Sequence, residues 1–310
     1  MLRINPKLIG LFAAFAIVAT ACTSSQASST TATQAPTTTQ TTIPATTTTS
    51  TTTTIAPTTS TSTATIPGVE VSESINGLPG DDTLIDRRVI AVKIDNHPKA
   101  RPQSGLDVAE VVYEILVEGQ TRFIALYQQT DLEYVGPNRS GRPTDAAVLK
   151  WFDPVFQISG AQPWVQSVFR SEGIRVVYDN GVATYRIPSR SAPQNLYMST
   201  IALREYADSL GWADDNPGNL FTFGDPTPGV DGADTVTISY FDTAPSVWEF
   251  DGEQYLRSTG STPHEWITKD GESGQVRFET IVALTGRKYI ARDPSGKGSS
   301  VPATDTVGSG

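Results

Sequence analysis

Polar side chains that could form a ligand site follow an apolar stretch near residue 95. Asp95, Asn96 and His97 come first, and a proline follows them directly. Polar groups at the exit of a buried strand are held rigidly and still meet solvent, so a binding or catalytic site could form there. The alternative is an ordinary turn, in which the Asp and Asn side chains bond backbone amides and the histidine is extended before proline. Both interpretations stay open.

Two arginines and a serine precede a predicted helix start at residue 144. They are Arg139, Ser140 and Arg142. Guanidinium forks bind carboxylates and phosphates bidentately, and free amides at a helix start favour the same anions. The run therefore favours an anionic ligand. The alternative is internal pairing of these arginines with Asp145 or Asp153.

A comparable loop, residues 189–197, precedes a second predicted helix and contains Asn195. It could form the opposite wall of a cleft or merely cap the helix. In the first case Asp95, Arg139, Arg142 and Asn195 are the expected main contacts to a ligand. The wider set of candidate ligand-binding residues is Asp95, Asn96, His97, Arg122, Arg139, Ser140, Arg142 and Asn195.

Glu118 and Arg122 flank the turn of a predicted hairpin. Glu114 and Glu118 are four residues apart, which is roughly 13 Å along a strand. The paired carboxylates of glycosidases are about 5–9.5 Å apart, so these two do not form such a pair. A three-residue loop would place Glu118 opposite Arg122, and a two-residue loop would place it opposite Thr121. The favoured interpretation is a structural salt bridge.

Common catalytic motifs are missing from the sequence. It contains no Gly-x-Ser-x-Gly elbow, no Walker-type loop, no His-Glu-x-x-His and no Cys-x-x-Cys. Two histidines and one cysteine exclude a multi-histidine metal centre and a thiolate zinc site within the chain. No cofactor is expected. The net charge of −10 repels anionic polymers, so nucleic acid is not an expected partner.

Short strands and two helices are predicted to position the candidate residues. The predicted strands are residues 89–95, 111–117 and 122–128, and the predicted helices are residues 144–151 and 200–210, the second ending at Gly211. A turn-rich segment, residues 214–232, follows. The remaining predicted strands are residues 235–241, 247–250, 254–258, 276–284 and 288–291, with a hairpin turn at 251–252. Residues 294–310 are rich in Gly, Ser and Pro and are expected to be loose.

The N-terminal residues carry the features of a lipoprotein signal peptide. Arg3 and Lys7 precede an apolar segment, residues 8–18, and small residues lead to Cys22. About eleven apolar residues are too few to span a bilayer, which needs about 20. We therefore expect cleavage before Cys22 and lipidation of its thiol. Residues 23–66 are almost entirely Thr, Ser, Ala, Pro and Gln without charge, which predicts a disordered stalk.

Several of these runs resemble the YerB-like lipoproteins, an uncharacterised bacterial family. The resemblance rests on residues 95–106, 112–114, 117–119, 121–123, 136–137, 139–140 and 142–143, and more loosely on 255–258 and 263–264. Gln194 stands where the family usually has histidine and Gly141 where alanine is usual, and the first departure argues against a catalytic imidazole there. The family's closing β-rich segment is absent after Gly310. The resemblance implies a lipoprotein location and two domains, the second incomplete, but no activity.

The sequence therefore predicts an α+β protein with four regions. They are a signal peptide at residues 1–21, a stalk at 22–66, a mixed α/β N-terminal domain at 67–229 and a smaller β-rich C-terminal domain at 230–310. The expected function is binding or scaffolding outside the membrane, with an anionic cell-wall ligand or an envelope protein as partner. The alternative is an envelope hydrolase that uses Asp95 or Glu118 as acid/base, with Arg139 and Arg142 binding the substrate anion. A third interpretation makes every polar cluster purely structural.

Overall fold

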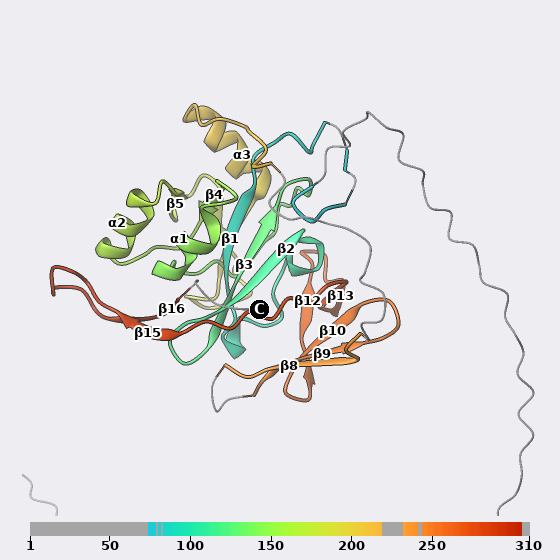
Figure 1. Cartoon of the computed structure of the whole chain (residues 1–310). Coiled ribbons are helices and arrows are strands. Elements are labelled where there is room, and N and C mark those ends of the chain that lie inside the picture. The colour runs from blue at the N-terminus through green and yellow to red at the C-terminus, as the bar shows by residue number, and fades with distance from the viewer. Residues whose placement is uncertain (1–73, 79, 82, 219–231, 241–243, 306–310) are drawn as a thin grey trace, which may run out of the picture. The chain divides into compact units, whose positions relative to one another are not determined.

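The computed structural model describes residues 74–78, 80–81, 83–218, 232–240 and 244–305 (Figure 1). These residues all belong to one compact unit. The expected signal peptide, the stalk and Cys22 lie outside the described residues. Within the described part of the chain, no helix combines the length and the apolar character needed to cross a membrane.

A five-stranded mixed sheet forms the centre of the described fold, and its order is β2-β3-β1-β4-β5. Its strands are β1 Ile90–Asp95, β2 Val111–Leu116, β3 Thr121–Tyr127, β4 Val155–Gln157 and β5 Arg175–Val177. β3 pairs antiparallel with β1 and β2, whereas β4 pairs parallel with β1 and β5. All residues of β1 and β3 are buried, because other elements cover both faces of these central strands.

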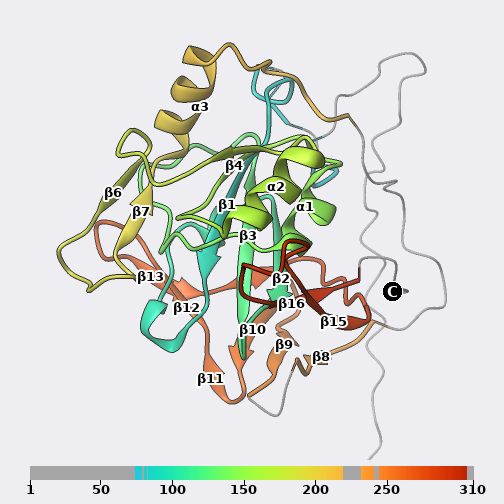
Figure 2. The ribbon, with the colours of Figure 1, turned by 90° about the vertical axis from the view of Figure 1, so that its left-hand side faces the viewer.

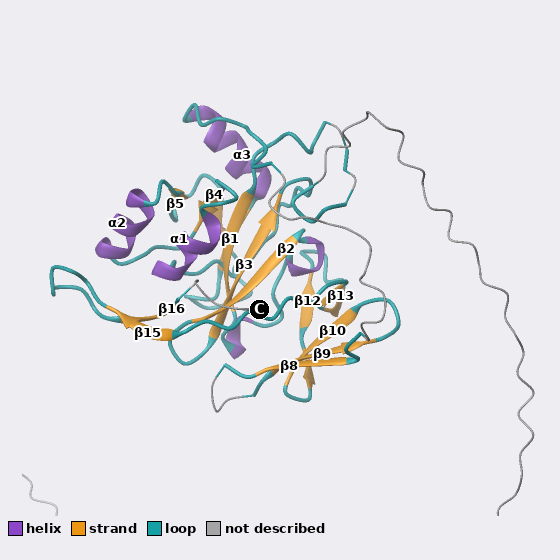
Figure 3. Cartoon of the chain, in the orientation of Figure 1, coloured by secondary structure: helices purple, strands orange, loops and turns teal. Residues whose placement is uncertain are grey.

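Three helices pack on the two faces of this sheet (Figure 3). α1 (Pro143–Leu149) and α2 (Pro163–Ser171) bury Leu149 and Phe169 against Ala91 and Ile124. α3 (Thr200–Ser209) buries Leu203 against the opposite face, in one core with Val92 and Ala125. α3 ends where Gly211 takes a left-handed φ of 68°, as the sequence predicted. The predicted helix at 144–151 is confirmed as α1.

The remaining elements are short strands and turns. The hairpin of β6 (Thr184–Arg186) and β7 (Leu196–Met198) precedes α3, and two 3₁₀ turns, Pro98–Ala100 and Leu106–Val108, follow β1. The second sheet contains β8 Thr235–Ile238, β9 Ser246–Phe250, β10 Tyr255–Thr259, β11 Thr262–Pro263 and β14 Arg277–Phe278. Two further pairs are β12 Glu265–Ile267 with β13 Ser273–Gln275, and β15 Lys288–Ala291 with β16 Val301–Thr304.

The second sheet lies against the face of the first sheet that α3 also covers. Phe278 of β14 packs against the core that contains Phe123, and so does Trp266 of the separate β12–β13 pair. The described helices all lie before residue 210, and the described residues after 234 contain only strands and loops. The predicted α+β class, with a mixed first part and a β-rich second part, is confirmed. The domain boundary at residues 229 and 230 stays a prediction, since residues 219–231 lie outside the described part.

Two expectations for the C-terminal residues were wrong. Residues 276–284 were predicted to form a strand, but only Arg277–Phe278 pairs, while Val282 and Leu284 are exposed and find no surface to pack on. The described part of the segment expected to be loose contains β16, in which Val301 and Ala303 are buried. β16 contacts α1 and β2, and its Thr304 amide donates to Thr144 Oγ1 at 3.0 Å (Figure 2). Burial against α1 therefore orders a segment whose composition alone favours disorder.

Candidate functional site

The carboxyl end of β1 and the start of β3 present polar residues to both faces of the first sheet. Asp95 is the register partner of Arg122, and both lie on the face covered by α1 and α2. Successive residues of a strand point to opposite faces. Asn96 and Thr121 accordingly meet on the other face, where Asn96 Nδ2 donates to Thr121 Oγ1 at 2.7 Å.

On the α1 and α2 face, seven charged residues form what we call the strand-end cluster. Its members are Lys93, Asp95, Glu118, Arg122, Arg139, Arg142 and Asp145. Lys93 and Asp145 are fully buried, and Nζ lies 2.6 Å from Oδ1. Burial lowers the pKa of Lys93 to about 8, although Asp145 opposes that shift. This pair joins β1 to α1 beneath the rest of the cluster.

The helix start that was expected to bind an anion already holds a carboxylate. The Arg142 amide donates to Asp145 Oδ2 at 2.8 Å, so the side chain of Asp145 occupies that position. Neither side chain of Arg139 or Arg142 pairs with Asp153, which binds Arg175 at 2.7 Å instead. The side chains of Arg139 and Arg142 are paired within the protein, but with Asp95 and Glu118 respectively rather than with Asp145 or Asp153.

Glu118 is the side-chain partner of Arg142. Val117 N donates to Gln120 O, so Glu118 and Gly119 form a two-residue loop. Both registers considered from the sequence were wrong, because Glu118 lies in the loop and Thr121 pairs with Leu116 instead. The two carboxylate oxygens of Glu118 accept from Arg142 Nε at 2.6 Å and Nη2 at 2.9 Å. Burial opposes ionisation of Glu118, but the bonds from Arg142 outweigh it and hold its pKa below the ordinary value. A carboxyl that is ionised at neutral pH has no proton to donate, so this geometry does not favour Glu118 as a general acid.

Asp95 is fully buried, yet its contacts are long. Its oxygens lie 3.4 Å from Arg139 Nε, 3.3 Å from Gln194 Nε2 and 3.3 Å from the His97 amide. Charge-assisted bonds are usually about 2.7–2.9 Å. The Arg139 Nε atom is buried without a hydrogen bond, and no described residue accepts from its terminal nitrogens. This part of the cluster is therefore loosely bonded.

Arg122 is the most deeply buried arginine of the cluster, and its guanidinium is only partly hydrogen-bonded. Only 4% of it is exposed, and its Nη1 donates to Ser140 O at 2.8 Å. Its Nε has no partner, and its Nη2 lies 3.8 Å from Glu118 Oε2. Burial and then the charge of Arg142 lower the pKa of Arg122 to about 10, which still leaves it a cation at neutral pH. A buried cationic N–H without an acceptor is costly in free energy.

Of the other candidate residues, Ser140 contacts an arginine of the cluster through its backbone oxygen, whereas the side chains of Asn195, His97 and Asn96 bond elsewhere. Asn195 Oδ1 accepts from Arg186 at 2.8 Å, and the neighbouring Gln194 reaches Asp95 instead. His97 Nδ1 accepts from the Lys99 amide at 3.1 Å and so caps a 3₁₀ turn. Asn96 and Ser140 are also bonded within the fold, the latter to Ser159 Oγ at 3.3 Å. Asp95 and His97 correspond to the turn alternative, since Asp95 accepts from the His97 amide, whereas the amide group of Asn96 bonds only side chains among the described residues and caps no backbone amide there.

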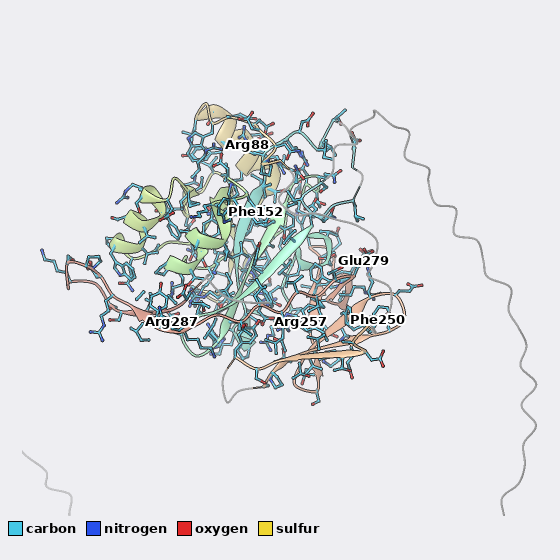
Figure 4. All side chains as sticks on the ribbon, in the orientation of Figure 1. Arg88, Phe152, Phe250, Arg257, Glu279 and Arg287 are labelled. Carbon is cyan, nitrogen blue, oxygen red and sulfur yellow. The ribbon has the colours of Figure 1, made fainter. Side chains whose placement is uncertain are left out.

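On the opposite face, a buried ion pair joins the two sheets. Arg257 of β10 (labelled in Figure 4) is 1% exposed. Its Nη2 donates to Glu114 Oε1 at 2.8 Å. The guanidinium carbon lies 5.3 Å from the Phe123 ring centre and 5.8 Å from that of Trp248. Ser246 Oγ also donates to Glu114, at 3.0 Å. Sequence reasoning considered Glu114 only as a partner for Glu118 and missed this role.

A chain of hydrogen bonds extends from this pair to the end of β1. Arg257 Nη1 donates to His264 Nδ1, and His264 Nε2 bonds Gln103 Oε1 at 2.8 Å. Gln103 Nε2 in turn donates to Asp95 O at 2.9 Å. Since the guanidinium can only donate, His264 is assigned as the neutral tautomer with its proton on Nε2. Burial and the charges of Arg257 and Arg101 lower its pKa to about 2.

Comparison with known proteins places the chain in a family. Residues 75–213 match the N-terminal domain of a protein family of unknown function, DUF3048. A Bacillus subtilis (strain 168) protein named "Putative lipoprotein YerB" is 31% identical over 246 residues, which is 72% of this chain and 72% of that protein. The chain belongs to the YerB-like family. The crystal structure of YerB from Bacillus subtilis superposes with a TM-score of 0.55 and 29% identity, covering 61% of this chain and 67% of that one.

The YerB-like motif residues meet in the structure although they are far apart in the sequence. Gln103 and Glu114 belong to the closely matching runs, and Arg257 and His264 to the two looser ones. The structure bonds Glu114 to Arg257 across 143 positions and Gln103 to His264 across 161. The resemblance of residues 255–258 and 263–264 to the family was the signal in the sequence that could have drawn attention to Arg257 and His264.

The neutral state of His264 predicts acid-sensitive folding. An unfolded histidine has a pKa of about 6.5, whereas the folded value is about 2. The unfolded state therefore binds more protons between these values, and stability falls as pH drops through 6.5. Between pH 7 and pH 5 this residue alone should lower the free energy of unfolding by about 2 kcal/mol.

Urea unfolding of the native chain and of His264→Gln at both pH values measures this contribution. The variant cannot titrate, so its loss between pH 7 and pH 5 should be about 2 kcal/mol smaller than that of the native chain. His97→Gln is the matched control, because His97 lies on a partly exposed turn. Equal losses in His264→Gln and the native chain would contradict the assignment.

Proposed function

We propose that this YerB-like chain is a lipid-anchored binding protein of the cell envelope, and that its strand-end cluster holds an oxyanion. The observation that carries the proposal is Arg122, a buried guanidinium whose Nε has no acceptor in the described structure. Arg139 lies beside Asp95, the register partner of Arg122, and no described residue accepts from the terminal nitrogens of Arg139. Two forks with open donors suit the two or more oxygens of a carboxylate or phosphate group.

The formal charges of the cluster support an anionic ligand. Lys93, Arg122, Arg139 and Arg142 are four cations, whereas Asp95, Glu118 and Asp145 are three carboxylates. The pairs Lys93–Asp145 and Arg142–Glu118 are closely bonded. One carboxylate, Asp95, then remains for Arg122 and Arg139. A bound monoanion would bring the cluster to neutrality, which favours binding in a partly desolvated place.

A lipid anchor on Cys22 would hold this site outside the membrane. The expected signal peptide ends at Cys22, and the relative from Bacillus subtilis is named as a lipoprotein. A diacylated cysteine anchors a protein stably, whereas one chain does not. Cys22→Ser should therefore move the protein from the membrane fraction to the soluble fraction. Unchanged fractionation would remove the anchor from this proposal.

Replacing Arg139 should weaken anion binding without loss of the fold. Calorimetric titration of the mature chain with inorganic phosphate at low salt should show binding, and Arg139→Ala should lower the affinity about tenfold or more, because a bond to a charged group contributes about 1.5–3 kcal/mol. The difference should shrink as salt is added.

Arg175→Ala is the matched control for this titration. Arg175 and Arg139 side chains are both 26% exposed, and each lies near one aspartate. The control removes the same charge from the protein but leaves the cluster untouched. Equal effects of Arg139→Ala and Arg175→Ala would show that phosphate responds only to net charge, and the proposed site would then be wrong.

A further inference from the structure

A cavity of about 340 Å³ lies where the two sheets meet, on the face of the first sheet opposite the strand-end cluster. Its wall includes Arg101, Thr121 and Glu114 from the first part of the chain. Tyr240, Arg257 and Thr259 line it from the second part. Small-molecule sites are usually concave pockets of about 300–1,000 Å³ with a few convergent polar groups, and this seam cavity meets that description.

Among the described residues that line the seam cavity, one cation has no counter-ion. The Glu114 carboxylate is taken up by Arg257, which donates from Nη2 at 2.8 Å and from Nε at 3.3 Å. Arg101 donates from Nε to Asn96 Oδ1 and from Nη2 to Asn96 O, and it has no ion-pair partner among the described residues. Its Nη1 likewise has no acceptor there. An anionic group against Arg101 would supply both the charge and the acceptor.

The burial of Arg101 and its neighbours adds to this need. Arg101 is partly buried, and desolvation, followed by the charge of Arg257, lowers its pKa from the ordinary value. His264 behind this wall is neutral, so it adds no charge to the cavity. The described lining therefore holds two guanidiniums and one carboxylate, a positive formal charge within an acidic protein.

Hydroxyl groups supply the rest of the polar lining. Thr121 Oγ1 and Tyr240 OH both donate to Glu114, at 2.7 Å to its carboxylate and 3.3 Å to its backbone oxygen. Thr259 Oγ1 accepts from Arg257 Nη1 at 3.1 Å. Thr121 and Tyr240 give their hydroxyl protons to Glu114, and Thr121 Oγ1 also accepts from Asn96, so both oxygens still have a lone pair that can accept. A ligand that carries its own hydroxyl donors fits this lining better than an apolar one.

We propose that the seam cavity is a second binding site, for a small hydroxylated monoanion of the sugar-acid type whose carboxylate lies against Arg101. The site shares no residue with the strand-end cluster and lies on the other face of the first sheet. It is therefore independent of the proposed phosphate site. Two parts of the chain form this site, because Arg101 precedes the three helices in the sequence and Tyr240 follows them.

D-glucuronate and D-glucose are the probes that test this proposal on the mature chain by calorimetric titration. Glucuronate should bind, and neutral glucose should bind at least tenfold more weakly because it cannot pair with Arg101. Arg101→Ala should reduce glucuronate affinity at least tenfold. Arg101 also bonds Asn96, so the substitution could affect folding. The melting temperature of the Arg101→Ala protein is therefore measured alongside its affinity.

A second variant keeps the test decisive if Arg101→Ala unfolds. Ala244 lines the seam cavity and is exposed. The indole ring of Ala244→Trp should therefore occupy the cavity without displacing buried side chains. It should also reduce glucuronate affinity at least tenfold, while phosphate binding stays unchanged. Arg139→Ala should do the reverse. Absence of glucuronate binding, equal binding of glucose, or full glucuronate affinity in a folded Ala244→Trp protein would each overturn the second site.

Discussion

Glu114→Gln is expected to lower the free energy of unfolding by about 3–5 kcal/mol, because it leaves a buried cation without its carboxylate. Arg257 is 1% exposed and lies between the rings of Phe123 and Trp248. Glutamine keeps the shape and one acceptor for Ser246 or Thr121, so the loss reports the missing charge. The free energies of unfolding of both proteins are measured by urea denaturation.

The surface pair of Lys269 and Glu133 supplies the control for this substitution. Its atoms are 3.7 Å apart, but the side chains are 63% and 72% exposed. Exposed pairs contribute little, so Glu133→Gln should change the free energy of unfolding by no more than about 0.5 kcal/mol. Similar small losses in both variants would mean that the Glu114–Arg257 pair does not hold the two sheets together.

Asp145→Asn is expected to cost a similar amount, about 3–5 kcal/mol at pH 7, because it removes the counter-ion of a fully buried lysine. The amide oxygen of the introduced asparagine could still accept from the Arg142 amide, so the start of α1 keeps its bond. Lys93 would lose the attraction that opposes its desolvation, and its pKa would fall further below the present value of about 8.

The pH dependence identifies Lys93 as the source of this loss. An unfolded lysine has a pKa of about 10.4, so lowering the folded value makes stability rise with pH between the two values. The deficit of Asp145→Asn relative to the native chain should therefore shrink as pH rises from 7 to 9. A deficit that is constant with pH would contradict this account. Glu172→Gln, which affects a 3.9 Å pair with half-exposed Lys150, is the control and should cost little.

The sequence determined the elements whose pattern is local. The apolar run of β1, the two strands around Glu118 and Gly119, and the helix that ends at Gly211 were all predicted and are present. Their signals are periodicity and turn chemistry, which neighbouring residues encode. β4, β5, β6 and β7 contain three residues each, too few for a period to show, and their burial comes from the surrounding fold. No element was assigned to residues 152–199.

The sequence also indicated which charged runs would be involved at the end of β1. Asp95, Arg122, Arg139 and Arg142 were candidates, and the structure brings them into one cluster. Adjacent strand ends and the segment before α1 meet at one edge of the sheet, which is why local reasoning could reach this set. Asn195 and Asn96 were exceptions, because Asn195 of the β6–β7 hairpin bonds Arg186 and Asn96 faces the other side of the sheet.

Only the tertiary structure decided which charge pairs with which and where a cavity lies. The Arg142 guanidinium binds Glu118 rather than Asp145 or Asp153, and Arg257 binds Glu114 from 143 positions away. Ion pairing depends on distance through space and on burial, and the sequence states neither. The seam cavity has the same origin, since it exists only where the two sheets meet. The sequence by itself therefore determined the parts of this protein, and packing determined the partners of its charges.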